Sequence, residues 1–179
     1  MKIAIASDLH GSWYYTQKLL TWLDATTPEK TLLLGDLLYH GPRNDLPTDY
    51  QPKRVIEALN QRAATWVCVR GNCDTEVDQM VLQFPILADC TWLMTEQVTL
   101  LATHGHRNAS LPPLQAGQVL LQGHTHVPMF EKKEGWLHVN PGSVSIPKEG
   151  SPHSAMLLEG RELSWIDLET QTVYRREQI

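Results

Sequence analysis

The sequence predicts an α/β (α+β) fold in which two β-sheets pack face to face and helices lie outside them. Two observations lead to this prediction. Short apolar, β-branched runs recur along the chain, and each ends in Gly, Asp, Asn or His, which is typical of strands buried on both faces. Helix-like stretches separate the first of these runs, whereas the later runs follow one another over short connections.

The first half of the chain alternates strands and helices. The predicted strands lie in KIAIASDLHG, TLLLGDLL and TWVCVRGN, and the predicted helices cover residues 13–24 and residues 52–62. This alternation favours parallel strands joined by right-handed crossovers. Residues 40–52 are a polar loop with three prolines, and long loops in compact domains are usually functional or disordered.

The second half is predicted to be more antiparallel. Strands are expected in VTLLATHGH, QVLLQGHTH and WLHVNPGS, and SAMLLEGRELSWIDL is typical of a hairpin that turns at residues 159–161. No linker, repeat or low-complexity tract interrupts the chain, so residues 1–179 are predicted to form a single domain.

Composition narrows the classes of partner. The net charge is −5 with no Lys/Arg cluster, which argues against binding to nucleic acid or to an anionic membrane surface. No apolar run approaches the ~20 residues that span a bilayer. The cysteines, Cys68, Cys73 and Cys90, are odd in number and form no CxxC, which favours a reducing cytoplasm. Apolar residues such as Trp13 and Trp92 fit a homo-oligomer interface and a core equally well.

Side chains that commonly bind metals follow five of the predicted strands. They are Asp8, His10, Asp36, Asn72, His104, His124 and His126. The pairs spaced by two residues are expected to point to one side of an extended backbone. Glycines 35, 71 and 123 each precede a candidate ligand, which fits tight turns and close backbone approach. The carboxyl ends of neighbouring strands share one crevice, so these side chains are expected to converge there.

The type and number of these ligands indicate a catalytic metal site. Seven nitrogen and oxygen ligands are too many for one structural zinc, which takes four and favours Cys. Imidazole mixed with carboxylate suits Mn, Fe, Zn, Ni or Co. A carboxylate between two clusters could bridge two ions about 3.5–4 Å apart, the usual arrangement for phosphoester cleavage.

The series D-x-H, GD, GN, H and GHxH resembles the motifs of the calcineurin-like metallophosphoesterase superfamily. The stretches GDLLYHGPRN, RGNCDTEVDQM, THGH, GHTHVP and NPGSVSIP resemble the YfcE-type bacterial phosphodiesterases within it. The resemblance covers essentially the whole chain. It implies the four-layer calcineurin-like phosphoesterase fold, a β-sandwich flanked by helices. It also implies a metal-dependent phosphodiesterase that hydrolyses a small phosphodiester with a hydroxide bridging two divalent metals, of which Mn is the first candidate.

The same resemblance assigns the ligands by position. Asp8, His10, Asp36 and His126 would hold one ion, and Asp36, Asn72, His104 and His124 the other, with Asp36 as the bridge. Asn72 has a second potential role, because its amide N–H can bind a phosphate oxygen. Many members of the superfamily place His directly after that Asn as the group that protonates the leaving oxygen, and here the residue is Cys73.

Cys73 is predicted to be passive or weakly hydrogen-bonding, because a neutral thiol with a pKa near ~8.5 is a poor donor. The alternatives for Cys73 are a metal ligand, through its thiolate, and a nucleophile. Asp74 is expected to orient a metal ligand by hydrogen bonding to it without touching the metal, as metal-bound His often requires. His40 and Arg43 are candidates for substrate contact, although a loop Arg facing solvent fits as well. His106 lies two residues past His104 and is a candidate for the same cavity.

Other residues carry weaker signals. Asn140, Gly142 and Ser143 are candidates for lining the site, although an ordinary Pro-Gly turn explains them equally well. His138 and His153 lie outside the motifs and are expected to be structural or at the surface.

Two other functions remain open from the sequence. The superfamily includes a small eukaryotic endosomal-coat subunit that serves as a non-catalytic protein-interaction scaffold, and retention of all seven ligands argues against that role here. A metal-dependent nuclease is the third hypothesis, and the missing basic patch argues against it.

Overall fold

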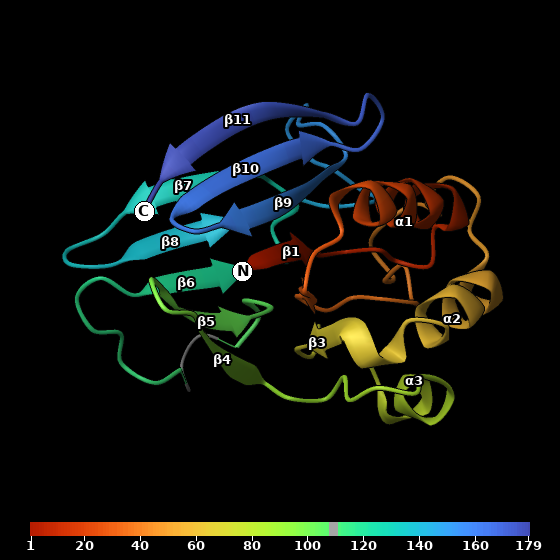
Figure 1. Cartoon of the computed structure of the whole chain (residues 1–179). Helices are drawn as coiled ribbons and strands as arrows, with labels where there is room; N and C mark the ends of the chain where they lie inside the picture. The colour runs from red at the N-terminus through yellow and green to blue at the C-terminus, as the bar shows by residue number, and fades with distance from the viewer. Residues whose placement is uncertain (108–110) are drawn as a thin grey trace.

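The computed structural model describes residues 1–107 and 111–179, and these form two mixed β-sheets with helices beside one of them (Figure 1). The six-stranded sheet has the order β11 (Thr172–Gln178), β10 (Glu162–Asp167), β9 (Ser154–Glu159), β1 (Lys2–Ala6), β2 (Lys30–Leu33) and β3 (Trp66–Cys68). The five-stranded sheet has the order β4 (Cys90–Met94), β5 (Thr99–Thr103), β6 (Val119–Gln122), β8 (Leu137–Asn140) and β7 (Met129–Lys132). The predicted two-sheet architecture is confirmed.

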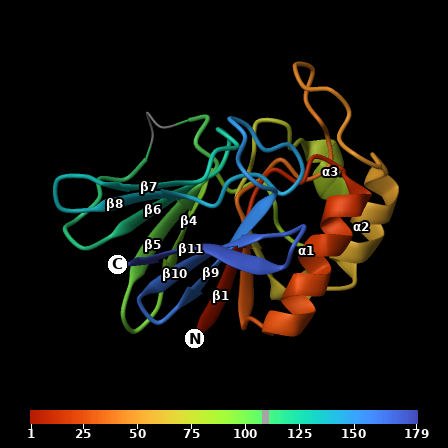
Figure 2. The same cartoon turned by 90° about the horizontal axis from the view of Figure 1, so that it is seen from above.

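Strand β1 separates two apolar cores. Ile3 and Ile5 pack toward the five-stranded sheet, and the small side chains of Ala4 and Ala6 pack toward the helices. Because side chains alternate across a strand, one buried strand serves both layers. Figure 2 shows the resulting order of five-stranded sheet, six-stranded sheet and helices.

The helices agree with the predicted alternation in the first half. α1 (Trp13–Thr26) begins after Ser12, whose Oγ accepts the N–H of Tyr15. α2 (Pro52–Asn60) begins with a proline at the position where a missing N–H costs nothing, and the 3₁₀ turn η1 (Ala63–Thr65) follows it. β1, β2 and β3 are parallel neighbours, as predicted.

The prediction of a more antiparallel second half is wrong for its centre. Within the five-stranded sheet of the described residues, β5 pairs with β6 and β6 pairs with β8 in parallel, and only the edge pairs β4–β5 and β7–β8 are antiparallel. The parallel arrangement brings the carboxyl ends of β5 and β6 to the same edge, which the expectation of short connections did not anticipate. The hairpin β9–β10 is confirmed, and β9 pairs antiparallel with β1.

Several short or polar elements were not predicted from the sequence. α3 (Glu76–Val81) has only six residues, and β11 is an edge strand with alternating exposure and several charges. β4 and β7 are short edge strands whose burial is only partial. Trp13 packs against the helical core, whereas Trp92 on β4 is 36% exposed. Within the two described ranges, no helix is long and apolar enough to cross a bilayer.

Candidate metal centre

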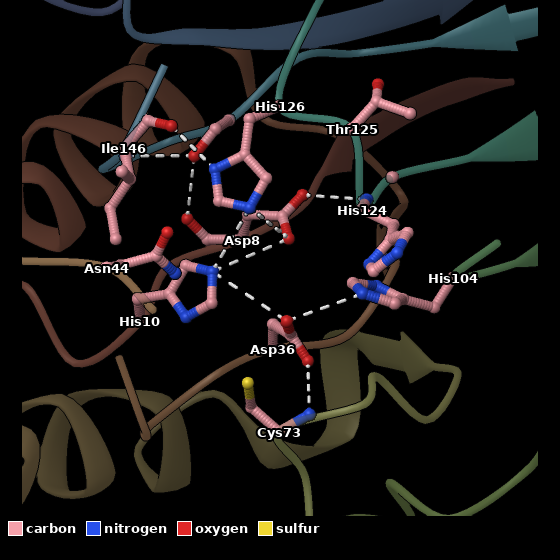
Figure 3. A network of polar contacts seen from close by, with 12 residues as sticks. Asp8, His10, Asp36, Asn44, Cys73, His104, His124, Thr125, His126 and Ile146 are labelled. Atoms are coloured by element: carbon pink, nitrogen blue, oxygen red, sulfur yellow. Dashed lines mark hydrogen bonds and ion pairs between the residues drawn. The ribbon is translucent and has the colours of Figure 1, made fainter. Parts of the chain in front are cut away.

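The carboxyl ends of strands from both sheets supply the candidate ligands. Asp8 and His10 follow β1, Asp36 follows β2 and Asn72 follows β3. From the other sheet, His104 follows β5, and His124 and His126 follow β6. Figure 3 shows the Asp and His side chains of this set turned toward one another. Because β1–β2–β3 and β5–β6 are parallel, their ends meet at one edge of the sandwich.

Three of the imidazoles are oriented by main-chain carbonyl groups. Nδ1 of His10 donates to Tyr39 O at 2.7 Å, Nδ1 of His104 donates to Leu34 O at 2.6 Å, and Nδ1 of His126 donates to Ile146 O at 2.6 Å. A proton on each Nδ1 leaves the Nε2 lone pair free in the neutral ring, as required of a metal-binding imidazole.

These Nε2 atoms point at other acceptors. Nε2 of His10 lies 3.4 Å from Nε2 of His126, and Asp8 Oδ1 lies 3.6 Å and 3.4 Å from those two nitrogens. Lone pairs that face one another across such distances repel unless a cation lies between them. This cluster therefore suits a bound cation.

A second cluster lies on the other side of Asp36. Nε2 of His104 is 3.1 Å from Asn72 Oδ1 and 3.4 Å from Asp36 Oδ2. The same Oδ2 is 3.7 Å from Nε2 of His10, so one carboxylate faces both clusters. The geometry fits the bridging position implied for Asp36.

His124 completes the second cluster. Its ring lies edge-on to that of His104, with the centroids 5.0 Å apart, and the residue lines the site cavity. Its backbone N–H donates to Asp8 Oδ2 at 3.2 Å, which leaves Oδ1 directed at the first cluster. Among the described residues, that Oδ1 atom is buried without a hydrogen-bond partner.

Two buried carboxylates create a demand for positive charge. Asp8 is 0% exposed and Asp36 is 2% exposed. Burial lowers the pKa of His104, but its hydrogen bond to Asp36 and the charges of Asp8 and Asp36 outweigh burial and raise the pKa to about 9. Burial raises the pKa of Asp8, yet the adjacent imidazole of His10 and the imidazoles of His104 and His126 lower it far below its usual range. The residues present fit divalent cations, which would supply this charge.

Five candidate ligands have a left-handed backbone. They are Asp8, His10, Asp36, His124 and His126, with φ between 46° and 66°. The expectation that each pair converges through an extended strand is therefore wrong: the pairs lie in turns past the strand ends. His124 and His126 consequently separate, with His126 in the first cluster and His124 in the second. Non-glycine residues with a left-handed backbone conformation are uncommon and cluster at functional sites.

The close backbone approach expected at the three glycines is confirmed. A Cβ on Gly35 would lie 2.3 Å from Gly71 N, and one on Gly71 would lie 2.0 Å from Asp36 Oδ1. A Cβ on Gly123 would lie 1.9 Å from Ser7 Oγ. No side chain fits at these positions, so glycine is required where the turns cross.

Cys73 lies beside the bridging carboxylate. Its backbone N–H donates to Asp36 Oδ1 at 2.8 Å, and its Sγ accepts from Asn72 Nδ2 at 3.2 Å. Its sulfur is also within 4.8 Å of ligand atoms of His10 and Asp36. Burial, followed by the charge of Asp36, raises the pKa of Cys73 to about 12, so the thiol is neutral. A neutral thiol in a weak hydrogen bond fits the passive role, whereas the position of the sulfur beside His10 and Asp36 fits the alternative of a metal ligand, so the role of Cys73 stays a prediction.

Asp74 acts on the backbone rather than on an imidazole. Its carboxylate accepts the N–H groups of Asp36, Leu37 and Gly71 at 2.8, 2.9 and 2.7 Å. It thereby joins the turn after β2 to the turn after β3. A role of Asp74 in orienting the ligand Asp36 through its backbone N–H stays a prediction.

The NPGS segment braces the site from behind and is absent from the residues that line the cavity. Asn140 Nδ2 donates to Gly123 O at 2.8 Å, and Ser143 Oγ donates to Asp8 O at 3.1 Å. Ser145 Oγ donates to the same carbonyl at 3.0 Å, and Gly142 N donates to Asn140 Oδ1 at 2.8 Å. These contacts favour the alternative of a structural turn over a segment that lines the site.

A polar cavity of about 340 Å³ opens above the ligands. Arg43 lines it, as expected, together with Asn44 and Lys148. Lys148 was not predicted from the sequence, because a lysine in an ordinary loop carries no motif. Two cations at this rim suit anionic phosphoryl oxygens.

Two further candidates for substrate contact, His40 and His106, pack against other rings near the site and stay predictions. The ring of His40 packs edge-on between Tyr39 and Tyr50. The ring of His106 packs against His104, with the centroids 5.4 Å apart. The cavity lining includes neither. His138 hydrogen-bonds Gln122 Oε1, and His153 stacks on Tyr15, so both are structural.

Comparisons with known proteins agree with this site. Residues 1–162 match the family described as the calcineurin-like phosphoesterase superfamily domain. The chain is 46% identical to phosphodiesterase YfcE of Escherichia coli (strain K12) over 175 residues, which cover 97% of this chain and 95% of that protein. It superposes on the structure of the E. coli phosphoesterase Yfce with a TM-score of 0.95 at 45% identity, covering 100% of both chains. Vacuolar Protein Sorting 29 from Cryptosporidium parvum shares the fold alone, with a TM-score of 0.65 at 18% identity over 99% of this chain and 97% of that one.

Proposed function

The chain belongs to the calcineurin-like phosphoesterase superfamily, and from this premise we propose that it hydrolyses a small phosphodiester with two divalent cations. One observation carries the proposal. Imidazole Nε2 atoms whose Nδ1 protons are held by carbonyl groups converge on two buried carboxylates, an arrangement that attracts cations. The relative named phosphodiesterase, at 46% identity, supports a diester over a monoester.

In this proposal the ligands divide as the two clusters do. Asp8, His10, Asp36 and His126 hold one ion, and Asp36, Asn72, His104 and His124 hold the other. Two such ions would supply an activated water as nucleophile and neutralise charge on the phosphoryl oxygens. Mn is the first candidate, with Fe, Zn, Ni and Co as alternatives that the same donors accept. We place the enzyme in the cytoplasm.

Side chains of the protein would position the substrate. The Asn72 amide N–H can turn from the Cys73 sulfur to a phosphoryl oxygen, because it loses only a weak hydrogen bond. Arg43 and Lys148, at the cavity rim, suit the remaining oxygens. The residue that follows Asn72 is Cys73, whose thiol is a poor proton donor, so esters of acidic alcohols are the expected substrates.

A substrate screen tests the proposal. We expect bis(4-nitrophenyl) phosphate to be cleaved faster than 4-nitrophenyl phosphate once Mn²⁺ is added, and cleavage to stop when a chelator removes the metal. The screen is repeated with each of the five metals, and with DNA and RNA. Binding of two equivalents of metal without diester cleavage would favour a scaffold, and salt-sensitive cleavage of nucleic acid would favour a nuclease.

The passive role of Cys73 leads to a second prediction. We expect Cys73→Ala to retain diester hydrolysis within about tenfold, because a neutral thiol contributes little to proton transfer. Cys73→His is expected to retain or raise the rate. Steady-state kinetics at full metal occupancy measures both, with Cys90→Ala as a control for thiol removal. An inactive Cys73→Ala enzyme that still binds two metal ions would contradict the passive role.

A further inference from the structure

An apolar groove runs beside the polar cavity. It encloses about 440 Å³, and its walls include Tyr39, Tyr50, Ile56, Val77 and Val81. Val77 is 68% exposed, and Tyr39 and Val81 are 42% and 43% exposed. Large apolar side chains left open to solvent beside a reaction site commonly mark a ligand surface.

The groove is continuous with the candidate metal centre. Cys73 lines both spaces and forms part of the wall between them. Tyr39, on the groove side, accepts the Nδ1–H of His10 through its backbone carbonyl at 2.7 Å. The groove therefore lies within reach of a substituent on a phosphoryl group that is bound over the metal ligands.

The walls of the groove are held in place. Tyr50 pairs with Ser12 in an isolated bridge, and the N–H of Gln51 donates to Gly11 O at 2.9 Å. A Cβ on Gly11 would lie 2.6 Å from Cε2 of Tyr50, so the tyrosine ring packs against the loop that carries Asp8 and His10. The groove and the ligand loop thus form one rigid unit.

The chemistry of the walls selects a neutral occupant. Asp78 is the charged residue among those that line the groove, and its carboxylate already accepts the Thr75 N–H at 2.7 Å and the Thr75 hydroxyl at 2.8 Å. Apart from Cys73 and Thr75, the remaining wall is aromatic and aliphatic, which suits a planar ring. The volume is ample for an aryl group.

We infer that this groove is the subsite for one alcohol group of the diester, and that the enzyme prefers phosphodiesters carrying an aryl or similarly large apolar group. The inference rests on the proposed function, because it assumes that the phosphoryl group lies over the metal ligands. In this arrangement the polar cavity binds the phosphoryl group, which all phosphoesters share, and the groove binds the alcohol group, which differs between them.

Phosphonates test the inference without a leaving group. Inhibition of bis(4-nitrophenyl) phosphate cleavage is measured for methylphosphonate, phenylphosphonate and 1-naphthylphosphonate with the Mn²⁺-loaded enzyme. We expect the naphthyl compound to bind ~10-fold or more tightly than the methyl compound, because burial of its rings adds to the same phosphonate contacts. A Val77→Asp variant should reduce this ratio to about twofold.

Met80→Asp is the matched control. Met80 lies on the same short helix and is 84% exposed, but it does not line the groove, so the ratio should stay at its original value. The ratio of naphthyl to methyl affinity is compared because a new carboxylate repels all three phosphonates, and this common effect cancels in the ratio.

The outcomes separate the two proposals. If methylphosphonate inhibits and the naphthyl compound gains nothing, the groove inference is overturned and the proposed function stands. If no diester is cleaved and no phosphonate inhibits, the proposed function itself fails. If Val77→Asp converts an oligomer to a monomer and leaves the ratio unchanged, the groove is a subunit interface and the inference is overturned.

Discussion

Asp36→Asn is expected to lower kcat/KM for phosphodiesters by about 1,000-fold or more. Asparagine tolerates the left-handed backbone at this position, where φ is 56°, and can still accept the Cys73 N–H. It cannot supply the negative charge that faces both clusters. Loss of a bridging charge costs several kcal/mol of transition-state stabilisation, and each 1.4 kcal/mol is about tenfold in rate.

Metal content distinguishes a lost site from a misfolded chain. After dialysis against Mn²⁺, the Asp36→Asn variant should hold fewer than two equivalents while its circular dichroism is unchanged. Asp49→Asn is the matched control, since Asp49 also has a positive φ, of 53°, but is exposed on a loop outside the site. Activity of Asp36→Asn within tenfold of the parent would refute a two-metal mechanism.

Gly71→Ala is expected to be nearly as damaging, although it adds only a methyl group. The new Cβ would lie 2.0 Å from Asp36 Oδ1 and 2.3 Å from Asp36 N, so the two turns must separate. We expect the free energy of unfolding to fall by about 1–3 kcal/mol. Displacing Asp36 by about 1 Å should lower kcat/KM by about 100-fold.

Gly117→Ala separates steric conflict from backbone strain. Gly117 has a φ of +82°, but no atom of the described residues lies within 4 Å of the point where an added methyl group would lie. The Gly117→Ala variant should lose about 1–2 kcal/mol of its free energy of unfolding, from the left-handed conformation alone, and keep its activity. Chemical denaturation and steady-state kinetics on both variants give the comparison. Equal losses of activity in both would contradict the proposed contact.

The ligand positions could be predicted because each one follows an apolar run. Asp36 after TLLL and His104 after VTLLAT are visible as polar residues where a strand must end. The partners of the imidazoles were not visible, because a backbone carbonyl such as Leu34 O or Ile146 O accepts a hydrogen bond whatever its side chain is. Tertiary structure alone decides which carbonyl group lies within reach.

The direction of β6 was mispredicted because the segment between β5 and β6 shows no helix period to mark a crossover. Its length, from residue 104 to residue 118, nevertheless suits a crossover better than a tight hairpin turn. Positive φ at Asp8 and His126 was equally hidden, since the sequence shows a residue type and not its backbone angle. Lys148 lies at the cavity rim because of the path of its loop, which the sequence does not reveal.

The left-handed turns also restrict how this protein can change over generations. A backbone with φ near 60° admits Asn, Asp, His and Gly far more readily than branched or bulky residues. Of these four, three carry side-chain oxygen or nitrogen atoms that bind metals. Substitutions that keep the backbone at Asp8, Asp36 or His126 therefore stay mostly among residues that can bind metals, even where they lower activity.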